Sequence, residues 1–178
     1  MKNLVAFLAL ASLLFACEKK VAETAAPAPE PVALPMEVTY PGTPAIGNMN
    51  NVKTVMEWNK RFSEMNFELG DLLADTVTWH LAEGMEMTSP RDSAVASIKK
   101  YMADLTNIKI IYTAAVPVDN VDKKDEWVFS WTDETYTHKD GKTEHQFIHE
   151  DYRLENGKIR EVYQYARKEV PPKPAAKK

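Results

Sequence analysis

Apolar and aromatic positions alternate with polar ones in three runs between residues 125 and 167. The runs are rich in Val, Phe, Trp, Tyr, Thr and Ile, and the dipeptides Asp140-Gly141 and Asn156-Gly157 separate them. Both dipeptides tolerate the positive φ angles that a two-residue hairpin turn requires. The pattern therefore predicts three consecutive antiparallel strands joined by two tight turns.

Two-residue turns also set the register, because opposed residues can be counted outward from each turn. The first count places Trp131 opposite Glu150, and the second places Glu150 opposite Tyr163. One face of the sheet is then expected to be covered and the other to be largely solvated. The predicted covered face comprises Trp127, Phe129, Trp131, Asp133, Ile148, Glu150, Tyr152, Leu154, Ile159, Tyr163 and Tyr165. The predicted outer face comprises Val128, Ser130, Thr132, Glu134, Phe147, His149, Asp151, Arg153, Arg160, Val162 and Gln164.

Upstream of these strands the spacing of apolar residues predicts helices. Residues 51–67 form an amphipathic pattern, and residues 69–73 predict a short second helix before a strand at residues 75–80. Ser89 as a cap and Pro90 at the first helical position predict the start of a third helix, followed by a strand at residues 108–118. The buried stripe expected on the third helix comprises Ala94, Val95, Ile98, Tyr101, Met102 and Leu105.

The order of these elements, together with four local segments, resembles the nuclear transport factor 2-like superfamily, including its SnoaL-like branch. The segments are the first amphipathic helix, residues 73–80, the capped helix from Ser89, and residues 152–159. The resemblance covers residues 51–167. It implies an α+β cone, in which a strongly curved antiparallel sheet packs against about three N-terminal helices and leaves a pocket at the open end. It also implies that many members dimerise through the outer sheet face.

The beginning of the chain resembles a bacterial lipoprotein signal. An early Lys2 precedes an apolar run at residues 4–15, and residues 14–17 read Leu-Phe-Ala-Cys. The run is shorter than the roughly 20 residues that span a bilayer. We therefore expect a signal peptide at residues 1–16, a lipid on Cys17, and a chain anchored at the bacterial cell envelope, on the outer membrane or the periplasmic face. The alternative is an ordinary signal peptide that ends near a cysteine.

Composition divides the remaining chain. Residues 17–48 are rich in Pro and Ala and predict an extended tether, residues 49–168 form the domain, and residues 169–178 form a tail. The formal charge of −4, from 22 basic and 26 acidic residues without a dense basic cluster, argues against a nucleic-acid partner. No glycine-rich phosphate loop, nucleophile elbow or cysteine pair is present, so no cofactor is expected.

Glu150 is the most informative residue, because a carboxylate in an aromatic row is costly to bury without a partner. We expect it to anchor a small ligand; alternatively, Tyr163 satisfies its carboxylate or it reaches solvent at the mouth of the cone. The other expected ligand-binding residues are Trp79, Trp131, Asp133, Tyr152 and Tyr163.

His80 is a second candidate for chemistry. In enzymatic relatives an acid or a His often follows the first long strand, and His80 matches that place. SnoaL-like members often have His-Asp-Pro where this chain has His-Leu-Ala at residues 80–82, so the usual carboxylate is missing. A His can act as a base near neutral pH. His80 and Glu150 are thus the candidate catalytic pair, and the alternative is a His at the pocket rim without chemistry.

A metal site is not expected. His145 and His149 are about 13 Å apart if they lie on a strand, which is too far to share one ion. His138 would at most add a loose third ligand on the same face.

Three functions follow from these patterns. The first is an envelope-anchored binding domain that holds a small apolar or amphipathic ligand, which we favour over an enzyme. The second is an enzyme of the isomerase, cyclase or dehydratase type. The third is a dimeric interaction module. A homodimer is expected to use apolar and charged outer-face residues: Val128, Phe147, Val162, Glu134, Asp151, Arg153 and Arg160.

Overall fold

The computed structural model describes residues 35–169. The predicted signal peptide, Cys17 and nearly all of the predicted tail lie outside the described residues. The described residues fall into two units, residues 35–39 and 40–169, and the second contains every helix and strand described below.

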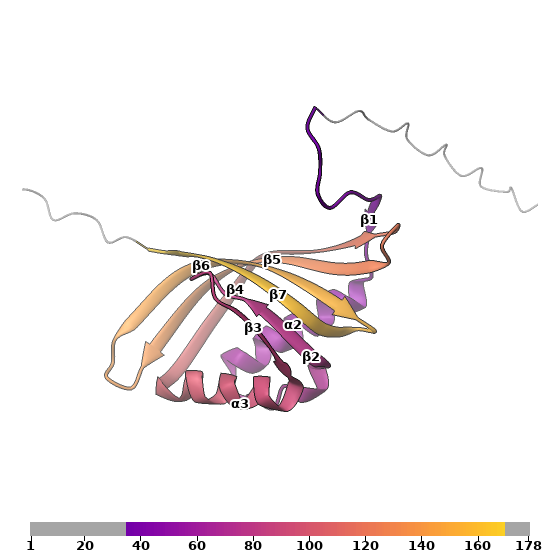
Figure 1. Cartoon of the computed structure of the whole chain (residues 1–178). Helices are drawn as coiled ribbons and strands as arrows, with labels where there is room; N and C mark the ends of the chain where they lie inside the picture. Colours follow the sequence, from indigo (N-terminus) through magenta and orange to yellow (C-terminus); the bar gives the residue numbers. More distant parts are fainter. Residues whose placement is uncertain (1–34, 170–178) are drawn as a thin grey trace, which may run out of the picture. The chain divides into compact units, whose positions relative to one another are not determined.

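A seven-stranded sheet forms the body of this second unit, in the order β1-β4-β5-β6-β7-β2-β3 (Figure 1). The α-helices α2 (Met49–Ser63) and α3 (Arg91–Tyr101) cover one face, which we call the concave face. Two three-residue 3-10 turns, η1 (Gly70–Leu72) and η2 (Met102–Asp104), precede strands. The strands are β1 (Pro44–Ile46), β2 (Leu73–His80), β3 (Glu86–Pro90), β4 (Leu105–Asn120), β5 (Asp125–His138), β6 (Thr143–Glu155) and β7 (Lys158–Lys168).

The core lies between α2 and the concave face of the sheet. Asn48 caps α2 by accepting a hydrogen bond from the Asn50 backbone N–H, at 2.9 Å. The helix then turns Val55 and Trp58 inward against Val128 and other buried strand residues. The amphipathic pattern of this helix therefore fixes which sheet face is covered. The predicted α+β cone is confirmed.

Several boundaries differ from the predictions. The expected second helix is only the turn η1, which leads directly into β2, so the described residues contain two α-helices rather than three. Ser89 lies in β3 instead of capping α3, and Tyr101 is 81% exposed instead of buried. Strand β1 lies inside the predicted tether and pairs with β4. The sheet is mixed, because β2 and β7 run parallel.

The first hairpin has a different turn from the one predicted. The His138 N–H donates to the Lys142 carbonyl at 2.9 Å, which leaves residues 139–141 as a three-residue loop with Gly141 at φ 83°. Such loops place a left-handed residue last. The extra loop residue shifts the register by one, so Ser130 rather than Trp131 faces Glu150. A shift of one reverses every side chain of β5. Four residues of β5 that were predicted on the outer face are therefore buried: Val128, Ser130, Thr132 and Glu134.

The second hairpin has the predicted two-residue turn, with Asn156 at φ 53° and Gly157 at φ 74°. Leu154 faces Ile159, as predicted. An irregularity beyond this pair then shifts the register by one. As a result Glu150 faces Gln164, and the predicted pairing of Glu150 with Tyr163 is wrong.

Candidate functional site

Two carboxylates, Glu134 on β5 and Glu150 on β6, project from the concave face. Glu134 accepts a hydrogen bond from Thr132 Oγ1 at 2.7 Å and another from the Tyr136 hydroxyl. Glu150 accepts one from Gln164 Nε2 at 3.0 Å and another from the Tyr152 hydroxyl. Every one of these donors is neutral.

Neither carboxylate forms an ion pair with a basic side chain in the described part of the chain. Glu134 is 5% exposed, and Glu150 is half-buried. Burial, and then the negative charge of Glu134, raise the pKa of Glu150 to about 7. Burial also raises the pKa of Glu134, although hydrogen bonds from Tyr136 and Thr132 oppose this effect. The two groups resist simultaneous ionisation, as carboxylates that share a site do.

Tyr112 on β4 connects this cluster to α2. Asn59 Nδ2 donates to the Tyr112 hydroxyl oxygen at 2.7 Å, and that hydroxyl lies 3.3 Å from the Val55 carbonyl oxygen to which it donates. Burial raises the pKa of Tyr112, and the charges of Glu150 and Glu134 raise it further. Tyr112 therefore remains a neutral hydrogen-bonding group at any physiological pH.

Ser130 contributes an unused polar atom. It lies directly across from Glu150 and is 1% exposed, yet its hydroxyl oxygen has no hydrogen-bond partner in the structure. Buried hydroxyls normally find a partner, because leaving one unpaired costs free energy. The concave face thus carries an unsatisfied hydroxyl directly across from Glu150, a carboxylate without a basic partner.

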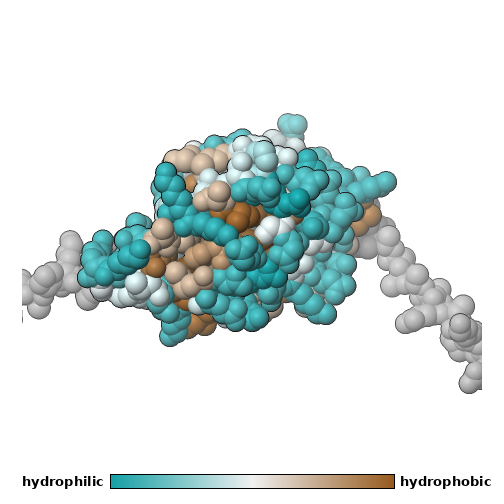
Figure 2. All heavy atoms as spheres, turned by 90° about the horizontal axis from the view of Figure 1, so that it is seen from below, coloured by the Kyte–Doolittle hydropathy of each residue, from teal (hydrophilic) through white to brown (hydrophobic). Residues whose placement is uncertain are grey.

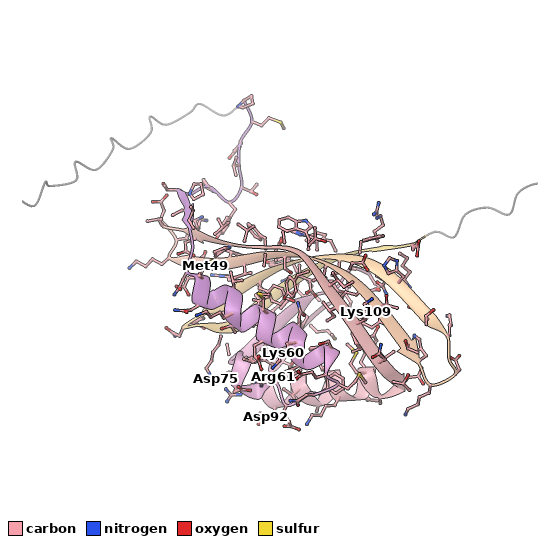
Figure 3. All side chains as sticks on the ribbon, turned by 180° about the vertical axis from the view of Figure 1, so that it is seen from behind. Met49, Lys60, Arg61, Asp75, Asp92 and Lys109 are labelled. Carbon is pink, nitrogen blue, oxygen red and sulfur yellow. The ribbon has the colours of Figure 1, made fainter. Side chains whose placement is uncertain are left out.

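An open groove of about 400 Å³ lies between α2 and β4. Eight residues line it, six from α2 and two from β4: Lys53, Met56, Glu57, Asn59, Lys60, Ser63, Ile110 and Tyr112. Figure 3 shows α2 from this side, with Lys60 on the helix. Seen from below in Figure 2, apolar side chains are exposed in the middle of the face, between hydrophilic margins. Glu134, Glu150 and Ser130 do not line this groove, and Tyr112 is the residue that the groove shares with their cluster.

A larger groove, of about 660 Å³, lies at the N-terminus of α2 beside the Asn156–Gly157 turn. Two ion pairs line it: Arg153 with Asp125 at 2.5 Å, and Arg160 with Glu155 at 3.2 Å. Asp125 and Glu155 therefore have the basic partners that Glu134 and Glu150 lack.

His80 does not reach the concave face. Its ring stacks on that of Tyr163, with centroids 3.9 Å apart, and its Nε2 lies 3.0 Å from Glu161 Oε1. Since Trp79 and Val162 are paired on the covered side, His80 and Tyr163 lie on the outer face. His80 and Glu150 project from opposite sides of the sheet, so the predicted catalytic pairing of these two residues is wrong.

The other predicted ligand-binding residues divide between the two faces. Trp79, Glu150 and Tyr152 lie on the concave side, where Trp79 stacks on Trp58 at 5.6 Å between centroids. Trp131, Asp133 and Tyr163 lie on the outer face because of the register shifts. There Trp131 packs on His149 at 4.6 Å between centroids, and Asp133 Oδ1 lies 2.6 Å from His145 Nε2.

Sequence reasoning missed five residues of this cluster: Tyr112, Ser130, Glu134, Tyr136 and Gln164. One signal was available. Residues 134–136 and 150–152 both read Glu-X-Tyr, and residues two apart on a strand share a face. The repeated motif indicates that the two carboxylates have equivalent tyrosine partners.

Neither a metal site nor a membrane-spanning helix is found among residues 35–169. No group of three His, Cys, Asp or Glu side chains there is arranged to hold a metal ion. Neither α2 nor α3 has the length and apolar composition needed to cross a bilayer.

Comparison with known proteins identifies the fold. No protein-family model and no curated protein matches the chain. An LEH-like epoxide hydrolase from M. tuberculosis superposes with a TM-score of 0.57 at 8% identity, over 67% of this chain and 84% of that one. A nuclear transport factor 2-like protein of unknown function from Burkholderia pseudomallei superposes with a TM-score of 0.53 at 16% identity, over 65% and 89%.

A third solved structure is a hypothetical protein with a ketosteroid isomerase-like fold from Catenulispora acidiphila, in complex with trimethylamine. Its TM-score is 0.52 at 20% identity, over 64% of this chain and 84% of that one. The chain therefore has the nuclear transport factor 2-like fold, and the fold that the resemblance implied is confirmed. Identities this low establish the fold and no activity.

Proposed function

We propose that this domain binds a small organic molecule on the concave face, with Glu150 as the polar anchor. The observation that supports this most strongly is the pair Glu134 and Glu150, which share a covered face without a basic partner. Burying unpaired carboxylates costs stability, and a fold that needed only a core would place apolar residues there. Perturbed carboxylates inside a concave surface are typical of functional sites.

The surrounding residues suit a ligand with an apolar part. Trp79, Ile110 and Tyr136 are only partly buried, and all three pack against the core. They supply an apolar wall next to the carboxylates. Tyr112 and Gln164 add neutral hydrogen-bonding groups. In ligand sites, a small number of polar groups within an apolar surface fixes the orientation of the ligand.

A second candidate function is acid–base catalysis, and the pKa of Glu150, at about 7, favours it. A base is most effective when its pKa lies near the working pH. Glu150 would then accept the proton, and Tyr152 and Gln164 would orient its carboxylate through their hydrogen bonds. The solved structures of the same fold include an epoxide hydrolase, so the fold accommodates catalysis in at least that protein.

The test is a fragment screen by NMR on the full chain, repeated on Glu150→Gln. Glu155→Gln is the matched control, since Glu155 ends the same strand and is exposed. We expect bound fragments to shift the Tyr112, Glu150 and Gln164 signals, and Glu150→Gln to weaken those hits at least tenfold while the control does not. Hits that contact only other surfaces would contradict the proposal. Turnover that follows the titration of Glu150 would favour the enzyme.

Anchoring at the cell envelope completes the proposed function. The signal-like residues 1–16 and the acceptor Cys17 support it, and the Pro- and Ala-rich segment that follows would hold the domain away from the membrane surface.

A further inference from the structure

We infer that the ligand held at Glu150 and Ser130, on the sheet face that Glu134 shares, is an organic cation, an ammonium ion that carries an apolar substituent. This inference rests on the proposed function and names the class of molecule that the site takes. It narrows the small apolar or amphipathic ligand expected from the sequence to one of defined charge.

The charge of the concave face supports the inference first. Two carboxylates share this face, and their four hydrogen-bond donors are all neutral. An ammonium ion supplies both the missing positive charge and N–H donors for carboxylate oxygens. A bound anion would be repelled by the same groups.

The unpartnered hydroxyl of Ser130 supports it independently. Its oxygen is buried beside Glu150 and accepts no hydrogen bond. A hydroxyl oxygen offers acceptor lone pairs, so an ammonium group next to Glu150 can donate a second N–H to Ser130.

Other charged groups near the site do not cancel this preference. Asp151, next to Glu150 in sequence, adds negative charge, and its effect on the pKa of Glu150 is upward. Lys53 and Lys60 are exposed at the border of the groove, and Lys60 lies 3.7 Å from both Glu57 and Glu64. Lys168, at the far end of β7, lies 4.0 Å from Glu144. No three His, Cys, Asp or Glu side chains among residues 35–169 are arranged for a metal ion.

Proton linkage gives the inference a distinct signature. A cation stabilises ionised Glu150, so its binding displaces a proton and weakens as the pH falls below about 7. A neutral ligand that accepts a hydrogen bond from protonated Glu150 would show the opposite pH dependence. Four other titratable groups lie on the same face as Glu150. Glu134 is a carboxylate whose pKa is also raised, and the three tyrosines, Tyr112, Tyr136 and Tyr152, stay neutral in this range.

Calorimetry on the full chain tests this with three probes of similar shape: cyclohexylmethylamine, cyclohexylmethanol and cyclohexanecarboxylate. We expect the amine to bind at least tenfold more tightly than the alcohol at pH 8. Between pH 8 and pH 6 its affinity should fall about tenfold, in line with a pKa of about 7. Glu150→Gln should abolish the preference for the amine, and the control Glu155→Gln should retain it.

Each other outcome overturns the inference. If the alcohol or the carboxylate binds as tightly as the amine and still depends on Glu150, the ligand class is wrong while the proposed site stands. If none of the three probes binds, the ligand class is also wrong, and the fragment screen with Glu150→Gln decides separately whether the site exists.

Discussion

Glu134 and Glu150 have equivalent partners: each accepts a hydrogen bond from the tyrosine two residues further along its own strand, Tyr136 and Tyr152 respectively. Both pairs face the concave side of the sheet. Glu161 and Tyr163 repeat the arrangement on the outer face, with the Tyr163 hydroxyl 2.8 Å from Glu161. The outer carboxylate also contacts Arg153 and His80, and its pKa is lowered instead of raised. The presence of a basic partner therefore separates a structural carboxylate from the two candidate functional ones.

Replacing Glu150 should stabilise the protein in mild base. Because the pKa of Glu150 is raised from 4.5 to about 7, its ionisation opposes folding above that range and costs nothing near pH 4. Glu150→Gln should therefore raise the free energy of unfolding at pH 8, by at most about 3 kcal/mol, with the gain vanishing towards pH 4. Urea unfolding at both pH values measures this. A variant that is less stable than the parent at pH 8 would show that Glu150 has a structural role.

Removing Arg153 should have the opposite effect. Burial raises the pKa values of Asp125 and Glu161, but hydrogen bonds outweigh this effect, so both pKa values are lowered. Asp125 accepts hydrogen bonds from Tyr40 and Arg153. Glu161 is hydrogen-bonded to His80, Tyr163 and Arg153. Their contribution to stability is present above the unperturbed values of 3.8 and 4.5 and is lost as the pH falls below them.

Arg153→Met should therefore lower the free energy of unfolding at pH 7 by about 1–3 kcal/mol, since it leaves the buried Asp125 without an ion-pair partner and Glu161 with His80 alone. The deficit should shrink below about pH 4. Arg160→Met is the control, because Arg160 and its partner Glu155 are 51% and 52% exposed and such a pair contributes little. Equal losses in the two variants, measured by urea unfolding, would contradict the role given to Arg153.

The sequence predicted the elements of the sheet well and its faces poorly. Alternating residues and two turn dipeptides located β5, β6 and β7, and the amphipathic pattern located α2. The register failed because Asp140-Gly141 fits either a two-residue or a three-residue loop, and only long-range packing selects between them. One residue of difference moved Trp131 outward and Glu134 inward. Glu150 stayed on the covered face, because the hydrophobic neighbours on its own strand, Ile148 and Tyr152, are buried in either register.

The outer face is expected to support a homodimer, although two of the predicted apolar anchors, Val128 and Val162, and the predicted charge Glu134 lie inside. An aromatic row crosses three strands of the outer face instead and consists of Trp131, His149 and Tyr165. The ring centroids of Trp131 and His149 are 4.6 Å apart, and those of His149 and Tyr165 are 5.7 Å apart. Trp131 is 40% exposed and Tyr165 is 56% exposed. Exposed aromatic surface of this kind favours association, and a two-fold axis makes it self-complementary.

Trp131→Asp should therefore abolish dimerisation, as measured by analytical ultracentrifugation at high micromolar concentration. Tyr101→Asp, an exposed aromatic position on α3, should leave it unchanged. A parent protein that remains monomeric, or a Trp131→Asp variant that still dimerises, would refute the proposed interface.

Cys17 should carry the lipid that anchors the chain. Changing it to Ser removes the thiol that is acylated, so Cys17→Ser should yield an unprocessed or soluble protein, detected by membrane fractionation and by a change in migration. Identical fractionation and migration of the variant and the parent would show that the signal-like residues do not direct lipidation.

The most direct test of the proposed site is the titration of Glu150 itself, followed by carbon-13 NMR of its carboxyl group in the full chain. A midpoint near 7 is expected, because the group is buried without a basic partner and lies near a second carboxylate. In Glu134→Gln the midpoint should fall, since the neighbouring negative charge is gone. A midpoint near the ordinary 4.5 in the parent protein would mean that Glu150 is solvated or paired, and would contradict the assignment of the concave face as the functional site.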